Sequence, residues 1–162
     1  MPMPAPASEA TTLLQQALAA IEADDHTSAL RLLKAGADEH PDDAQITYWL
    51  GAEYACLELF DAAEAALERA LAIDPAHHLA RFHLGLLMVT RARFEAAVGV
   101  WQALDALPDG APLRHYKQAF DALAQDRFAP ARREIDAALA AGGATADLDA
   151  QMRRLRDSLP AA

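Results

Sequence analysis

Side chains of matching size recur at one fixed interval along this 162-residue chain. Two positions of the interval hold small residues throughout, Ala17, Gly51, Gly85 and Ala119 at one and Ala29, Ala63, Ala97 and Ala131 at the other. A third position holds rings, His26, Phe60, Phe94 and Phe128, and a fourth holds large apolar residues, Leu33, Leu67, Trp101 and Ile135. A period of about 34 residues with this pattern predicts stacked helix-turn-helix units, an architecture that presents a binding surface more often than a catalytic site.

The stretch 44–77 resembles the tetratricopeptide repeat. It carries the Leu-Gly-x-x-Tyr of that family as Leu50, Gly51 and Tyr54, and the closing Ala and Pro as Ala70 and Pro75. The stretch 78–111 keeps several of these features, and the outer two match more weakly, as terminal repeats do. The resemblance implies an all-α fold, a right-handed α-solenoid of helix-turn-helix repeats.

The same period sets the expected domain organisation. We predict four repeats, at 10–43, 44–77, 78–111 and 112–145, with a flexible N-terminal tail at 1–9 and a capping helix at 146–162. The capping helix is predicted from four apolar residues at helical spacing, which would cover the last repeat. These are Leu148, Met152, Leu155 and Leu159.

The charge of the chain is uneven. Residues 1–76 hold 14 acidic and 3 basic side chains, whereas residues 77–162 hold 10 and 11, and the whole chain has a net charge of -10. An acidic protein repels nucleic acid and anionic membrane, so we predict neither as a partner, while the acidic half could steer a basic one. We predict a cytoplasmic protein, because the opening MPMPAPASEA is no secretory signal, no apolar run is long enough to span a membrane, and the lone Cys56 has no internal disulfide partner.

No pattern of residues indicates catalysis. The sequence has no His-Glu-x-x-His, no phosphate-binding glycine loop and no nucleophile elbow. His77 and His78, with Asp74 and His83 nearby, could bind a metal, but adjacent residues rarely converge on one ion, so a polar loop between repeats is favoured. Cys56 is interpreted as a small thiol that is buried or lines the groove. We therefore predict no enzymatic activity, no cofactor and no metal; a metal-dependent enzyme is the alternative of another class.

The resemblance also implies a binding site, because first helices of successive tetratricopeptide repeats line a concave groove. The apolar residues at the groove positions of this chain are the predicted client-binding residues. They are Tyr48, Ala52, Phe82, Leu86, Val89, Tyr116, Phe120 and Leu123. An apolar strip on a soluble protein calls for a partner that covers it, so we predict a protein or peptide client with an apolar segment.

These observations favour a non-enzymatic adaptor or chaperone. Small acidic proteins of this kind resemble the tetratricopeptide chaperones of bacterial secretion systems, and the alanine- and arginine-rich composition is typical of a bacterium with GC-rich DNA. Two alternatives remain open at this point. The chain could be a self-assembling structural subunit, for example a homodimer, or its groove could close on itself through contact between Leu86 and Phe120.

Overall fold

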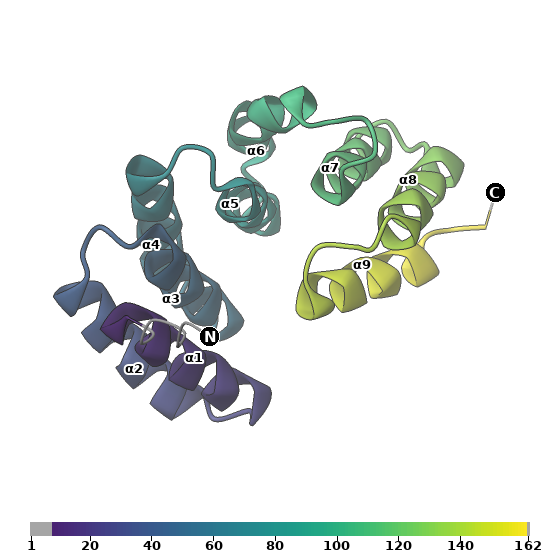
Figure 1. Ribbon diagram of the computed structural model, residues 1–162. Coiled ribbons are helices and arrows are strands. Elements are labelled where there is room, and N and C mark those ends of the chain that lie inside the picture. The colour runs from purple at the N-terminus through teal and green to yellow at the C-terminus, as the bar shows by residue number, and fades with distance from the viewer. Residues whose placement is uncertain (1–7, 162) are drawn as a thin grey trace, which may run out of the picture. The chain divides into compact units, whose positions relative to one another are not determined.

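The computed structural model describes residues 8–161, which form nine α-helices, one 3-10 helix and no strand. The first compact unit, residues 1–91, contains α1 (Glu9–Glu22), α2 (His26–Glu39), α3 (Ala44–Cys56), α4 (Phe60–Ile73) and α5 (His78–Thr90) (Figure 1). The second, residues 92–162, contains α6 (Phe94–Trp101), the 3-10 helix η1 (Gln102–Ala106), α7 (Pro112–Leu123), α8 (Phe128–Ala140) and α9 (Ala146–Ser158). The all-α class is thus confirmed, and no helix in the described range is long and apolar enough to cross a membrane.

Polar side chains stabilise the first turns of several helices. The Ser8 hydroxyl accepts the Thr11 backbone N–H at 3.2 Å, and Asp61 and Glu95 lie in the first turns of α4 and α6, where the helix dipole favours acids. Because Ser8 caps α1 and Glu9 begins it, the end of the predicted tail at 1–9 belongs to the helix. Residues 1–7 of that tail lie outside the described range.

Closely packed helix pairs form the core of each unit. The 34-residue interval defines columns of equivalent residues, one from each repeat. Every residue is buried in the two columns of small residues and in the column of large apolar residues. Gly51 shows how close the contact is, because a Cβ added there would lie 2.8 Å from Leu67 Cγ on α4. A methyl group at this position has no room, so the small residue is a packing requirement of the α3–α4 pair.

The tight turn inside each helix pair repeats the same backbone conformation. Residues with positive φ, all between 55° and 59°, stand at the same place in successive repeats, at Asp24, Glu58, Ala92 and Asp126. After Asp24, Glu58 and Asp126 the next backbone N–H bonds back to a carbonyl five residues earlier, which satisfies the end of the preceding helix. None of the four is a glycine, so the sequence alone gives no signal for these turns.

The second unit departs from regular repeats at η1 and is extended by α9. The helix after Phe94 stops at Trp101 and the chain continues as η1, whose Leu104 is buried where the other repeats carry Gly36, Ala70 and Ala138. Helix α9 buries Leu148 and Met152, each 1% exposed. It is also held by the Tyr116 hydroxyl, which donates to Asp149 Oδ1 at 2.6 Å, and by Arg132, which donates to the Leu159 and Pro160 carbonyls.

We expect Gly51→Ala to destabilise the protein by about 1–2 kcal/mol, because overpacking against Leu67 outweighs the gain in helix propensity. The matched control is Gly99→Ala on α6, where an added Cβ would meet no atom within 4 Å. This variant should gain about 1 kcal/mol from helix propensity. Urea unfolding measures both, and the packing argument fails if the two variants shift stability in the same direction.

We expect Glu58→Gly to stabilise the protein by roughly 0.5–1 kcal/mol, since glycine adopts a φ of 59° without steric cost. Glu68→Gly, on the exposed side of α4, serves as the control and should cost about 1 kcal/mol. The comparison of the two free energies of unfolding separates the turn effect from the loss of a charge. A destabilised Glu58→Gly protein would contradict the strain at this turn.

Candidate client-binding surface

The eight predicted client-binding residues lie on the first helices of their repeats. Helix α3 carries Tyr48 and Ala52, and α5 carries Phe82, Leu86 and Val89. In the second unit, α7 carries the remaining three, Tyr116, Phe120 and Leu123.

Three of the eight are aromatic residues at equivalent positions of successive repeats, and these three are core residues. Tyr48, Phe82 and Tyr116 are 1%, 0% and 0% exposed. The family resemblance implies that these rings line a groove, but a buried ring offers a client no contact area. They are therefore removed from the candidate surface, which is corrected to the residues beside them.

Two other columns hold apolar side chains that are partly exposed in all four repeats. Each column has one member on each of α1, α3, α5 and α7. These half-buried residues are Leu18, Ala52, Leu86 and Phe120 in one column and Ile21, Ala55, Val89 and Leu123 in the other. We call Leu18, Ala52, Ala55, Leu86 and Val89 the first-helix face of the first unit.

Neighbouring first helices of the first unit are in contact, so this face is not a set of isolated residues. Ile21 packs on the core cluster of Ala17, Leu33 and Ile46, which joins α1 to α3. Helices α3 and α5 are joined by the Tyr48 hydroxyl, which lies 2.8 Å from His83 Nδ1. In the second unit, Phe120 packs on Trp101 with ring centroids 5.0 Å apart.

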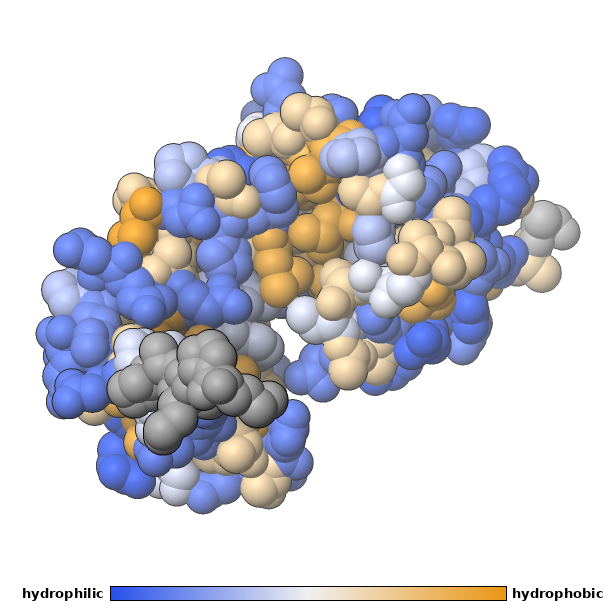
Figure 2. All heavy atoms as spheres, in the orientation of Figure 1, coloured by the Kyte–Doolittle hydropathy of each residue, from blue (hydrophilic) through white to orange (hydrophobic). Residues whose placement is uncertain are grey.

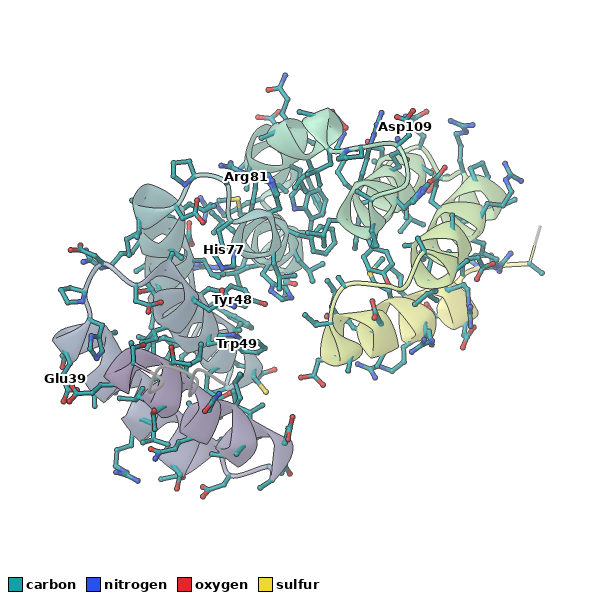
Figure 3. All side chains as sticks on the ribbon, in the orientation of Figure 1. Glu39, Tyr48, Trp49, His77, Arg81 and Asp109 are labelled. Atoms are coloured by element: carbon teal, nitrogen blue, oxygen red, sulfur yellow. The ribbon has the colours of Figure 1, made fainter. Side chains whose placement is uncertain are left out.

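Histidines between α3 and α5 form part of this packing. Figure 3 shows Tyr48, Trp49 and His77 close together, and the His77 and His83 rings lie 4.9 and 5.5 Å from that of Tyr48. His77 caps α5, because its Nδ1 accepts the Ala80 N–H at 3.1 Å, which leaves its Nε2–H to donate to Gln45 Oε1 at 2.7 Å. Burial lowers the pKa of His77, and burial together with the nearby His77 lowers the pKa of His83 to about 4.

The proposed metal ligands therefore have other roles. His77 and His83 hold α5 against α3, and Asp74 accepts the Ala76 backbone N–H at 3.0 Å. In the part of the chain that the structure describes, no three His, Cys, Asp or Glu side chains form a group that could hold a metal ion. The prediction of a buried or groove-lining thiol was wrong in its first alternative, because Cys56 is exposed at the end of α3.

Solved structures share this arrangement of helices. The MamA 41-end from Desulfovibrio magneticus RS-1 is 17% identical, with a TM-score of 0.65 over 94% of this chain and 88% of that one. A crystal structure of MamA is 19% identical, with a TM-score of 0.65 over 88% of this chain and 81% of that one. An O-GlcNAc transferase mutant from Thermobaculum terrenum is 22% identical, with a TM-score of 0.66 over 80% of this chain but only 25% of the transferase. MamA and the transferase both contain tetratricopeptide repeats.

This chain has the tetratricopeptide repeat fold. At these identities the likeness concerns the fold alone, and it confirms the resemblance seen in the stretch 44–77. No protein-family model matches the sequence, and no curated protein matches it. The tetratricopeptide α-solenoid is thus shown by the structural likeness, whereas the boundaries of the four repeats stay predictions.

Sequence reasoning missed a polar contact between α2 and α3. His26, at the first position of α2, lies 2.6 Å from Glu53, whose side chain is 3% exposed. The sequence does carry a signal for this contact. His26 stands where the next repeat has Phe60, and Glu53 stands where the next repeat has Leu87, so both polar residues occupy positions that are apolar one repeat later. A second missed contact joins Lys117, which is 9% exposed, to Asp105 and Asp121 at 2.9 and 2.7 Å.

We expect acid to destabilise the first unit through His83. The folded pKa of about 4 lies below the ordinary value of 6.5, so the unfolded chain takes up the proton first as the pH falls. The contribution of neutral His83 to stability is therefore complete above pH 6.5 and is lost toward pH 4, by at most about 3.5 kcal/mol at 1.4 kcal/mol per pKa unit.

The test compares urea unfolding at pH 7 and pH 4.5 for the wild type and for His83→Gln, whose amide can still bond the Tyr48 hydroxyl. The variant should lose less stability between the two pH values. An equal loss in both proteins would show that His83 does not carry the acid sensitivity.

Proposed function

We propose that this chain is a non-enzymatic protein-interaction module that holds an apolar segment of a client protein. The observation that supports the proposal most directly is the half-buried apolar character of both columns that border the buried aromatic positions. Apolar side chains that stay in contact with water gain free energy when a partner covers them, by about 25 cal/mol for each Å² removed from water. In the first unit the client would contact the first-helix face, and in the second unit Phe120 and Leu123.

The shape of this face fits a helix or an extended peptide better than a small molecule. Ala52 and Ala55 on α3 are short, whereas Leu18 on α1 and Leu86 on α5 are longer. Short side chains between longer ones leave space for a protruding side chain of a client. Amphipathic helices and extended segments both use such rows of apolar anchors.

The charge of the first unit adds a preference for a basic client. Residues 1–91 carry 14 acidic and 5 basic side chains, and Arg91 is already paired with Asp61 and Glu64 at 2.9 Å. Figure 2 shows polar side chains over most of the visible surface of this unit. Exposed acids such as Asp38, Glu39 and Asp42 would accelerate the approach of a basic client without contributing most of the affinity.

The finer form of the proposal is a cytoplasmic adaptor or chaperone, such as the chaperone of a bacterial secretion system. The tetratricopeptide fold supports it, since this architecture presents extended binding surfaces. The competing function is self-assembly, in which the client is another copy of the chain. The mass of the purified protein in solution separates the two.

We expect Leu18→Ala and Leu86→Ala each to weaken client binding about fivefold or more, because an interface anchor contributes about 1 kcal/mol or more. The matched controls are Leu57→Ala and Leu59→Ala, which truncate leucines 37% and 48% exposed in the turn between α3 and α4. A client captured from the native extract and then purified is titrated against all four variants.

Salt provides the second arm of this experiment. Loss of binding in the Leu18 and Leu86 variants should be independent of ionic strength, whereas Glu39→Gln and Asp42→Asn should slow association only at low salt. Asp43 is left unchanged, because its carboxylate caps α3 by accepting the Gln45 and Ile46 N–H groups. If the leucine variants bind the client as tightly as the wild type and binding is lost on adding salt, the apolar face is not the binding surface and an acidic surface is favoured.

A further inference from the structure

The contact of His26 with two carboxylates has the geometry of a charged group. His26 Nδ1 lies 2.6 Å from Glu53 Oε1 on α3, and His26 Nε2 lies 3.0 Å from Asp24 Oδ1 in the turn before α2. A neutral imidazole has one N–H and one acceptor nitrogen, so it cannot donate to two carboxylates at once. With both carboxylates ionised, the arrangement therefore requires the imidazolium, and hydrogen bonding to Glu53 is the main cause that raises the pKa of His26.

Glu53 depends on this charge because of where it lies. Its side chain is 3% exposed, on a helix whose Ile46, Thr47, Tyr48 and Gly51 are also buried. A buried carboxylate is costly unless it is paired and hydrogen-bonded, and His26 supplies that pairing. If His26 loses its proton, Glu53 loses the opposite charge, and it keeps this hydrogen bond only when the remaining ring proton is on Nδ1.

One repeat further along the chain, the two equivalent positions carry no charged residue. Position 26 corresponds to Phe60 and position 53 to Leu87, so a ring and an aliphatic residue replace the histidine and the glutamate. Leu87 is 5% exposed, so this position is buried in both repeats. The chain thus uses a titratable pair between the first two repeats and an apolar pair at the equivalent positions between the second and third.

We propose that His26 and Glu53 form a proton-dependent joint between α2 and α3, closed when His26 is protonated and weakened when it is neutral. The charged groups that face His26 are Asp24 and Asp25 from the turn between α1 and α2, and Glu53 from α3. Arg31 on α2 acts on Asp25. Three acids around one imidazole favour its charged form, so the joint is closed in acid and weakens as the pH rises.

The direction of the pH effect follows from linkage. The pKa of His26 is raised above its ordinary value of 6.5, so its contribution to stability is complete below that pH. The contribution is lost as the pH rises through the folded pKa. Helices α1 and α2 should then open more often, which exposes the cluster formed by Ala17, Leu33 and Ile46.

The experiment measures imidazole titration by NMR and amide hydrogen exchange between pH 6 and pH 9, corrected for the intrinsic exchange rate. In the wild type, protection of the amides in α1 and α2 should fall roughly fivefold or more as His26 titrates, with no matching change in α9. Glu53→Gln should lower the pKa of His26. Glu134→Gln is the control, because it breaks the His115–Glu134 contact of 2.7 Å in the second unit and should leave both readouts unchanged.

A double variant keeps the test independent of whether a single variant folds. His26→Phe with Glu53→Leu introduces the pair found in the next repeat, and protection of α1 and α2 should then not change over this pH range. Three results would each overturn the joint: constant protection in the wild type while His26 titrates, wild-type pH dependence in the double variant, or an unchanged His26 pKa in Glu53→Gln.

Discussion

The close approach of paired helices, α1 with α2, α3 with α4 and α7 with α8, is the constraint on which the structure depends. Gly51 lets α3 approach α4 so closely that a methyl group would lie 2.8 Å from Leu67. Such contact gains dispersion and apolar burial over the whole length of both helices, which offsets the low helix propensity of glycine. Small residues recur at the same positions of the repeat, and the turns share one backbone conformation.

Contacts between successive repeats are more varied than those within a repeat. At the first of them, α2 meets α3 through His26 and the buried Glu53. At the far end, Tyr116 on α7 donates to Asp149 on α9. Polar contacts of this kind require matching partners, since a buried polar group without one costs about 1–3 kcal/mol. The polar partners therefore differ from one end of the array to the other.

The surface proposed for client binding lies beside the aromatic positions that the sequence predicted as binding residues. The large aromatic residues Tyr48, Phe82 and Tyr116 looked like binding anchors, yet the tertiary structure uses them as core. What remains accessible is a row of smaller aliphatic residues. A ring next to a helix contact removes more apolar area from water when it turns inward, so size alone favours burial.

The sequence by itself determined the class of fold and the two positions of the repeat that hold small residues. These features are local or strictly periodic, and helix contact demands small side chains wherever the period brings helices together. Only the tertiary structure decided that Tyr48 is core, that Cys56 is exposed and that His26 reaches Glu53. The partners in such contacts lie in different helices and far apart in sequence, so the packing of one helix on another selects which side chains meet.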